Sequence, residues 1–296
     1  MPREFSEVLT MLRSLRLVVV ALTLALVSSL TLAPAAAQPS NLELILATTT
    51  STQDSGLLDV LVPEFQRQSG YTVKTISVGT GQAMALGERG EADVLLVHAP
   101  DSEKKWMEAG HGVDRKLVMY NDFVIVGPPS DPISLAGAQS AVEAMQKIAA
   151  NGALFVSRGD NSGTHQLELK LWTDAGFDPK GTPWYQEAGQ GMGAVLTIAN
   201  EKEAYTITDR GTYLARKPTL DLTVLAEGYQ TFLNVYHVMV VNPEKGNHVN
   251  VEGARVFADF IVAPATQTTI STFGVEKFGQ PLFFPAATMT DAQLGV

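Results

Sequence analysis

The feature that most constrains the fold of this chain is a regular alternation of short apolar runs with amphipathic stretches. Apolar runs at 44–47, 72–78 and 92–97 predict strands, and the stretches at 56–68 and 82–89 have the residue spacing of helices. An order of strand, helix and strand builds a parallel sheet with helices on its faces. We therefore expect an α/β fold whose ligand lies beyond the carboxyl ends of the strands.

Two long apolar segments, at 116–129 and 232–243, bracket a second set of predicted elements. That set has helices at 134–150, 162–175 and 192–200 and strands at 153–160, near Trp184 and at 204–209. The bracketing predicts two lobes, each a mainly parallel sheet flanked by helices, and two hinge crossovers. Lobe 1 is predicted to comprise 38–123 and a return over 237–296, which contains a helix at 251–261, lobe 2 to comprise 124–236, and the hinges to lie near 121–126 and 234–240.

The first 37 residues are predicted to be a secretory signal peptide. A charged stretch that ends at Arg16 is followed by the apolar run 17–32 and by the small residues 35–37. This is the order of a cleaved signal, with Gln38 as the new amino terminus. An uncleaved anchor is the alternative, but the run is shorter than the about 20 residues that span a bilayer. Because the chain has no cysteine for lipid attachment, we expect a freely diffusing periplasmic protein.

Charge and residue spacing narrow the class of function. The formal net charge of −10 argues against nucleic acid, whose sites need clustered Lys and Arg. The five histidines lack metal-binding spacing, and the G-x-G-x-x-A match at 189–194 is a weak nucleotide signal by itself. An exported hydrolase is the alternative class, because Asp160, Ser162 and His165 occur together, yet catalytic triads draw their members from separate segments. We expect a binding protein with no catalytic residue, metal or cofactor.

The most informative stretch is FVSRGDNSGTHQLELKLW, at 155–172. Ser162 can cap a helix, and a helix start has unpaired N–H groups that attract anions. Gly163 lets an anion approach the backbone closely, Thr164 adds a second hydroxyl, and Arg158 offers a planar fork for two oxygens of one oxyanion. The alternative, in which Ser162 is a cap and Arg158 pairs with an aspartate, does not need all of these residues together.

Small polar residues also follow the first two predicted strands. Thr50 and Ser51 end the run TTTS, and Thr80 and Gly81 lie in GTGQ. Since the carboxyl ends of parallel strands share one edge of the sheet, these neutral donors are expected to face Arg158 across a crevice. Many neutral donors can satisfy a buried oxyanion. The sequence therefore predicts an anion site between the lobes.

Four segments, at 47–65, 78–100, 157–172 and 191–213, together resemble the tungstate-binding periplasmic proteins of ABC transporters, the TupA-type family. The resemblance runs over essentially the whole mature chain. It implies a two-lobed periplasmic binding protein type II fold that closes on a tetrahedral oxyanion, an ABC permease at the inner membrane as partner, and a monomer. It implies ligand contacts at Thr50, Ser51, Thr80, Arg158, Ser162 and Thr164. The arguments from the residues add Gly81, as an N–H donor after the second strand, and Gly163, at the helix start.

Phosphate-binding proteins of the same fold are an alternative, since they share the pattern R-x-D-x-S-G-T seen here from Arg158 to Thr164. They usually place an aspartate where this chain has His98, and that aspartate accepts the proton of hydrogen phosphate. Tungstate and molybdate carry no proton at neutral pH, so the absence of the carboxylate favours an unprotonated dianion. Physical argument does not distinguish tungstate from molybdate. Thr49, His98 and Asp160 are expected as further cleft-lining residues.

Overall fold

The computed structural model describes residues 41–246 and 248–296. The predicted signal peptide at 1–37 lies outside the described residues. Within the described residues, no helix combines the length and the apolar character needed to cross a membrane.

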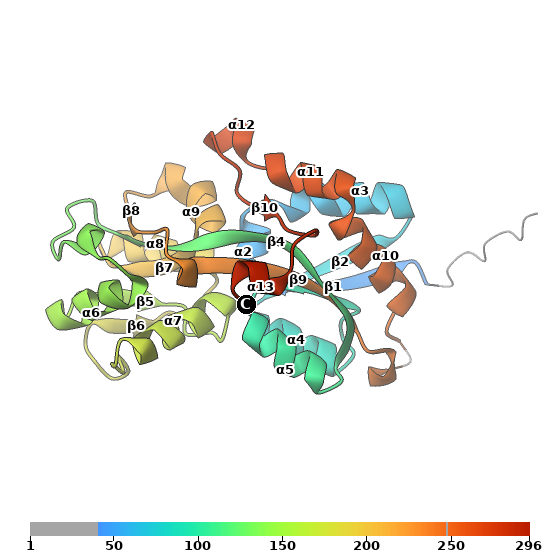
Figure 1. Cartoon of the computed structure of the whole chain (residues 1–296), viewed down its shortest axis with the longest axis horizontal. Coiled ribbons are helices and arrows are strands. Elements are labelled where there is room, and N and C mark those ends of the chain that lie inside the picture. Colours follow the sequence, from blue (N-terminus) through green and yellow to red (C-terminus); the bar gives the residue numbers. More distant parts are fainter. Residues whose placement is uncertain (1–40, 247) are drawn as a thin grey trace, which may run out of the picture. The chain divides into compact units, whose positions relative to one another are not determined.

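The chain begins with the predicted parallel strands. β1 (Glu43–Thr49) pairs parallel with β2 (Thr72–Val78) on one side and with β3 (Val94–Val97) on the other. The helices that follow them are α2 (Thr50–Asp54), α3 (Leu58–Ser69), α4 (Thr80–Glu88) and α5 (Pro100–Glu108). The expected α/β order is confirmed here, and the carboxyl ends of β1, β2 and β3 share one edge of the sheet (Figure 1).

Two long strands connect this region with the middle of the chain. β4 (Gly112–Gly127) and β9 (Leu233–Val241) pair antiparallel with each other, and β9 also pairs antiparallel with β3. β4 continues into antiparallel pairing with β7 (Thr206–Asp209) and β8 (Thr223–Ala226). The two long strands therefore add antiparallel pairs to sheets that were expected to be mainly parallel.

The middle of the chain forms the second α/β set. Its further elements are α6 (Ala141–Asn151), β5 (Phe155–Ser157), α7 (Gly163–Asp174), β6 (Tyr185–Glu187), α8 (Met192–Glu201) and α9 (Arg210–Arg216). β5 and β6 pair parallel as a separate two-stranded sheet. Figure 1 shows α6 and α7 on the left of the view and α4 and α5 on the right.

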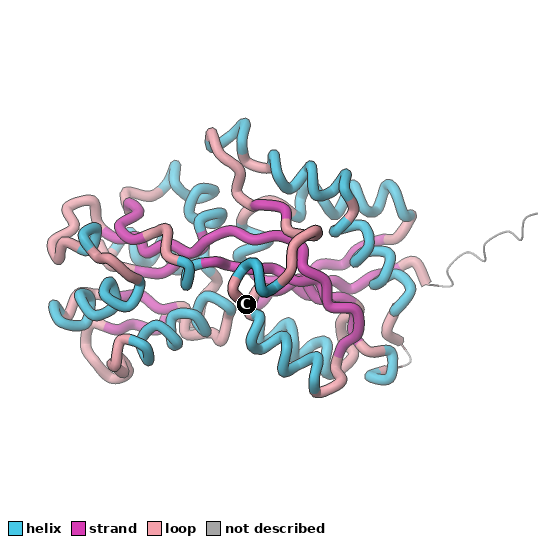
Figure 2. The backbone as a smooth tube through the Cα atoms, viewed as in Figure 1, coloured by secondary structure: helices cyan, strands magenta, loops and turns pink. Residues whose placement is uncertain are grey.

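After β9 the chain returns to the sheet on which it began. The returning elements are α10 (Val251–Val262), α11 (Pro264–Thr272), α12 (Val275–Phe278), β10 (Phe284–Pro285) and α13 (Asp291–Leu294). β10 pairs antiparallel with β4, and the last residues of the chain lie beside the long strands at the middle of the view (Figure 2).

The apolar side chains form two groups of clusters, which we call core 1 and core 2. Core 1 surrounds the first strands and the returning helices, with Leu44, Phe65 and Phe257 among its buried residues. Core 2 surrounds the middle of the chain, with Trp172 and Ile207 among its buried residues. β4 supplies both cores, since Val118 and Met119 pack in core 1 whereas Phe123 and Ile125 pack in core 2. The lobe boundaries and hinges named above stay predictions.

Three predicted helix starts were wrong. The helix expected at 82–89 begins earlier, at Thr80. The helix expected at 134–150 begins at Ala141, because Ser140 caps it: the Glu143 N–H donates to Ser140 Oγ at 3.1 Å. The helix expected at 56–68 begins at Leu58, since Gly56 has φ +83° and belongs to a turn. α2, a five-residue helix before that turn, was not predicted.

Candidate functional site

Several helices begin at one place between the two cores. α4 starts directly after β2, α7 starts after the loop that follows β5, and α8 starts at Met192. Ser162 caps α7, and the His165 N–H donates to Ser162 Oγ at 3.2 Å. Because each helix start carries unpaired N–H groups and a partial positive charge, this place favours an anion.

Contacts between the first residues of these helices show that the segments meet. The Gly81 N–H donates to the carbonyl oxygen of Asn161 at 3.3 Å, which joins the start of α4 to the loop before α7. A Cβ added to Gly163 would lie 2.8 Å from the ring and the carbonyl oxygen of His98. A Cβ added to Gly191 would lie 3.3 Å from Thr50. Glycine at 163 therefore permits a close approach of α7 to the end of β3.

Arg158 lies at the centre of this arrangement. Its side chain is 1% exposed, and one nitrogen, Nη2, donates to Thr50 Oγ1 at 3.1 Å and to Asp160 Oδ2 at 2.5 Å. The other two nitrogens, Nε and Nη1, are buried and have no hydrogen-bond partner among the described residues. A buried guanidinium with two unused donors can bind two oxygens of one anion.

Two buried hydroxyl groups at helix starts likewise have no hydrogen-bond partner among the described residues. Thr80 Oγ1 at the start of α4 and Thr164 Oγ1 at the start of α7 have no partner within the described part of the chain. Buried polar atoms in proteins are nearly always hydrogen-bonded. The starts of α4 and α7 meet where the Gly81 N–H donates to the Asn161 carbonyl oxygen, so the unused donors from these segments suit a ligand that accepts hydrogen bonds.

His98 and Ser51 lie on the core-1 side of the site, next to these donors. Ser51 Oγ lies 3.2 Å from His98 Nε2 and 3.1 Å from Thr49 Oγ1. Burial, followed by the charge of Arg158, lowers the pKa of His98 to about 4. His98 is therefore neutral at pH 7, and adds no charge to the site.

Two carboxylates lie close to Arg158. Burial raises the pKa of Asp160, but the Arg158 charge and hydrogen bonds from Arg158 and Ser162 outweigh burial and hold the pKa below its usual value. Asp209 caps α9, accepting from Thr212 N at 2.8 Å and from Thr212 Oγ1 at 2.7 Å, and burial raises its pKa. The positive charge of Arg158 is thus balanced within the protein, so an added anion gains no net positive field and depends on the hydrogen bonds that Arg158, the hydroxyl groups and the helix starts can donate.

The predicted site residues differ in whether their polar groups already have partners within the protein. Those with a buried side-chain polar atom that has no partner among the described residues are Thr80, His98 (at Nδ1), Arg158 and Thr164. Thr49, Thr50, Ser51, His98, Asp160 and Ser162 contact one another or Arg158, while Gly81 uses its N–H on Asn161 and Gly163 packs against His98. Their assignment as ligand contacts stays a prediction.

Contacts of Asp54 and Thr212 at the site were missed by sequence reasoning. The Gly193 N–H in α8 donates to Asp54 Oδ2 at 3.2 Å, and Thr212 Oγ1 lies 3.3 Å from the carbonyl oxygen of Ser51. The partners are more than 130 residues apart in sequence, at separations of 139 and 161. The glycines at 191 and 193 were the signal for the start of α8, and nothing in the sequence pointed to Asp54.

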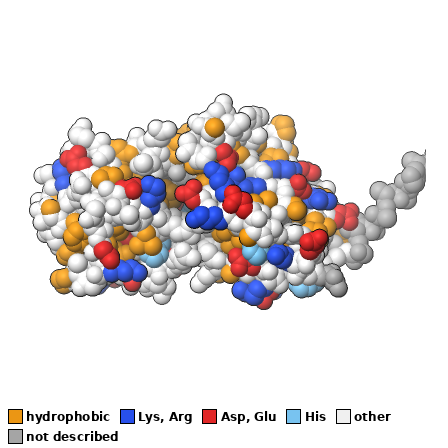
Figure 3. Space-filling view, turned by 60° about the horizontal axis from the view of Figure 1, so that its bottom comes forward, with side chains coloured by type: hydrophobic (Ala, Val, Ile, Leu, Met, Phe, Trp, Pro, Cys, Tyr) orange, Lys and Arg blue, Asp and Glu red, His pale blue; other side chains and the backbone are white. Residues whose placement is uncertain are grey.

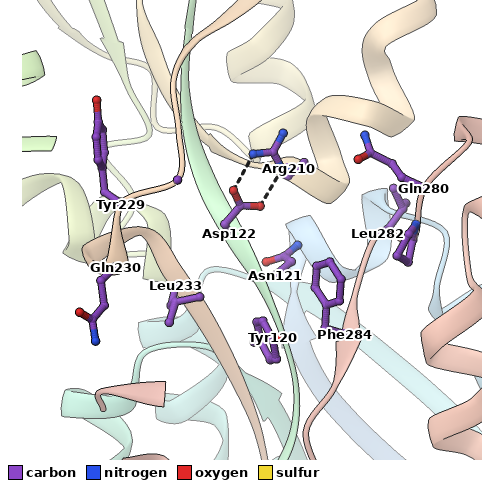
Figure 4. A pocket seen from close by; sticks show the side chains of 12 residues that line it. Tyr120, Asn121, Asp122, Arg210, Tyr229, Gln230, Leu233, Gln280, Leu282 and Phe284 are labelled. Carbon is purple, nitrogen blue, oxygen red and sulfur yellow. Dashed lines mark hydrogen bonds and ion pairs between the residues drawn. The ribbon is translucent and has the colours of Figure 1, made fainter. Parts of the chain in front are cut away.

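Two cavities adjoin the long strands. One, of about 450 Å³, is lined from both cores and includes His98 and Gly163. The other, of about 520 Å³, is shown in Figure 4 and holds the ion pair of Asp122 with Arg210, whose Nη2 also reaches Glu227. Arg210 is therefore paired with two carboxylates, whereas Arg158 pairs with Asp160 through Nη2 and keeps two nitrogens without a partner among the described residues. On the outer face shown in Figure 3, charged side chains of both signs are interspersed.

Comparisons with known proteins agree with this geometry. The family model described as a PBP superfamily domain matches residues 34–265. The tungstate-binding protein TupA of Peptoclostridium acidaminophilum is 50% identical over 246 residues, covering 82% of this chain and 86% of the relative. The crystal structure of the tungstate ABC transporter from Geobacter sulfurreducens is 52% identical, with a TM-score of 0.71, and the match covers 78% of this chain and 98% of that chain. The tungstate-binding protein TupA from Desulfovibrio alaskensis G20 is 44% identical, with a TM-score of 0.69, and the match covers 83% of this chain and 99% of that chain.

Proposed function

The chain belongs to the PBP superfamily and, within it, to the TupA family of tungstate-binding proteins, and on this basis we propose that it is the solute-binding component of a tungstate ABC transporter. It binds the oxyanion and delivers it to the permease. No bond of the ligand is made or broken, and neither a metal nor a cofactor takes part.

One observation carries the proposal most strongly. Two nitrogens of Arg158 and the hydroxyls of Thr80 and Thr164 are buried without partners among the described residues, and they come from the loop after β5 and from the starts of α4 and α7. A tetrahedral oxyanion has four acceptor oxygens, and hydrogen bonds between donors and a charged acceptor are the strong ones. Such an anion satisfies all of these donors at once.

The mechanism is closure of two lobes around the anion. Core 1 and core 2 are the centres of the lobes, and β4 and β9, which link the two cores, act as the hinges near 121–126 and 234–240. The anion binds first to the donors of one lobe. The contacts that it then makes with the other lobe favour the closed state by the difference in affinity.

Phosphate is the competing ligand, because the segment from Arg158 to Thr164 fits it as well. Hydrogen phosphate carries a proton that needs an acceptor in the site, and this chain has a neutral His98 where the phosphate-binding proteins usually place an aspartate. Asp160, the nearest carboxylate, already accepts from Arg158 and from the Ser162 N–H. These contacts favour an unprotonated dianion, either tungstate or molybdate.

Membership of this family also supports a proposal for where the protein is located and which partner it meets. We place the protein in the periplasm after removal of its signal peptide, as a monomer that meets an ABC permease at the inner membrane. The overall negative charge and the interspersed charges of Figure 3 suit a diffusing protein better than one that binds nucleic acid.

Calorimetric titration of the mature protein with tungstate, molybdate, sulfate and phosphate at pH 7.5 tests the proposal. We expect tight binding of tungstate, weaker binding of molybdate and no heat from phosphate. Preference for phosphate would mean that the Arg158 to Thr164 segment determines the ligand. Absence of binding to all four anions would refute the proposal and return attention to a hydrolase.

A further inference from the structure

The buried carboxyl group of Glu168 is the strongest titratable feature that the proposed function leaves unused. It lies on α7, in the second turn after the capped start, and is 1% exposed. Three donors point at it: Ser157 Oγ donates to Oε2 at 2.7 Å, while Tyr185 OH at 2.7 Å and Trp172 Nε1 at 3.2 Å donate to Oε1. A carboxyl group held at both oxygens is fixed in position.

Ser157 links this carboxyl group to the residue that carries the site. Ser157 ends β5 and directly precedes Arg158, and its Oγ accepts the Gly159 N–H at 3.2 Å. The hydroxyl therefore ties the residues on both sides of Arg158 to Glu168. Two backbone bonds complete the support, since Ala188 N donates to Ser157 O at 2.9 Å and Gly189 N donates to Arg158 O at 2.8 Å.

This support matters because the protein holds the guanidinium group of Arg158 through one nitrogen only, as far as the described residues show. Of its guanidinium nitrogens, Nη2 has protein partners, whereas Nε and Nη1 have none among the described residues. A long side chain with unused donors keeps one conformation only if its backbone is fixed. The loop after β5 has no regular structure until α7 begins at Gly163, so the Ser157 hydroxyl is the side-chain anchor at its start.

We propose that Glu168 and Ser157 form a clamp that positions Arg158 for the anion. Both are positioning residues, which act through Arg158 and do not touch the ligand. The inference rests on the proposed function, because it assigns a role within the same oxyanion site. It does not depend on which tetrahedral oxyanion is preferred.

The ionisation of Glu168 sets the conditions of the test. Burial raises the pKa of Glu168 to about 7, although the hydrogen bonds from Tyr185, Ser157 and Trp172 oppose the rise. Titrations at about pH 8 therefore keep the group mainly as a carboxylate, which accepts the Ser157 hydroxyl.

The test is calorimetric titration of Ser157→Ala with tungstate at that pH. We expect the affinity to fall about tenfold or more, because hydrogen bonds from Arg158 to a charged ligand lose their geometry. The matched control is Thr206→Val, since Thr206 Oγ1 donates to the Val156 carbonyl at 2.7 Å on the same strand. The control removes a buried hydroxyl of β7 that bonds to β5 without touching 157–159, and its affinity should stay within about threefold of wild type.

A double-mutant cycle separates positioning from general damage. In an Arg158→Ala background, Ser157→Ala should cause no further loss of affinity, because the residue that it positions is gone. Glu168→Gln, which keeps the shape of the side chain, is the second variant and should be non-additive with Ser157→Ala. Unfolding curves for all variants check that each is folded before titration.

The outcomes distinguish the two proposals. If the wild-type protein binds none of the oxyanions, the proposed function fails. If the wild type binds tungstate but Ser157→Ala binds equally well, or loses as much affinity as Thr206→Val, the clamp is refuted and the function stands. An equal loss from Ser157→Ala with and without Arg158 also refutes it.

Discussion

Arg158 shows how a single residue can serve an anion site in an acidic protein. Its charge is balanced by Asp160, so it does not offer a net positive field to the ligand. Its contribution is hydrogen bonding, because two of its nitrogens are buried without partners among the described residues. The cost of leaving such donors unsatisfied disfavours the closed state without an anion.

Arg158→Ala should reduce tungstate affinity by several kcal/mol, since each hydrogen bond to a charged group contributes about 1.5–3 kcal/mol and two are lost. Calorimetry measures the change. Arg89→Ala is the control, because Arg89 is exposed and pairs with Glu91 on the surface. An affinity equal to that of the control would remove Arg158 from the site.

His98 should make the folded state sensitive to acid. Its pKa is about 4 in the folded protein against an ordinary value near 6.5, so below pH 6.5 the unfolded chain takes up the proton first and stability falls. At pH 4.5 the loss from this group is about 2.5 kcal/mol. Urea unfolding at pH 7 and at pH 4.5 measures it, and the pH dependence of His98→Gln should be smaller by that amount. Equal pH dependence in both proteins would contradict the assignment.

The residues of the site were predictable to the extent that they stand in compact motifs. Arg158, Ser162 and Thr164 occupy one short segment, whose pattern indicates an anion at a helix start. The bonds of Asp54 to Gly193 and of Thr212 to Ser51 could not be predicted. These bonds join residues far apart in the chain. One sequence, without related sequences to compare, gives no reason to pair them.

At the scale of elements, α7 combines three roles. Its first residue packs against His98, its next hydroxyl faces the site, and Glu168 one turn further anchors the loop before it. The start of α7 was predicted correctly because Ser162 is a strong capping residue. The start of α6 was predicted too early, since the apolar residues before the Ser140 cap belong to a separate short turn.

Gly163→Ala should weaken anion binding without greatly destabilising α7, because the added Cβ would lie 2.8 Å from His98 and oppose the approach of the two elements. Calorimetry should show a loss of about tenfold. Small-angle scattering should show less compaction on addition of tungstate. Gly137→Ala is the control, since the nearest atom to its added Cβ is Lys147 Nζ at 3.5 Å, and a loss of the same size there would contradict this explanation.

At the scale of the whole molecule, binding and folding are coupled. A ligand that contacts donors from both cores binds the native chain and not the unfolded one, so it stabilises the fold by mass action. The parallel strands and the helix order were predictable from periodicity. The path of β4 through both cores was anticipated from its length, whereas its bulges and antiparallel partners depend on tertiary packing.

Saturating tungstate should raise the melting temperature. At a thousand times the dissociation constant the stabilisation is about 4 kcal/mol, which for a domain of this size corresponds to a shift of about 8 °C or more. Differential scanning fluorimetry measures the shift. Phosphate at the same concentration is the control, and an equal shift with phosphate would contradict the proposed selectivity.

The burial of Arg158, Thr80 and Thr164 has a consequence for timing. An anion held by these donors cannot leave while the two lobes are closed. Its dwell time is therefore set by how often the lobes open. The rate of exchange should then be independent of the concentration of a competing anion in the solution. Such a protein keeps its bound anion when the medium is diluted. Release then requires a partner that holds the two lobes open.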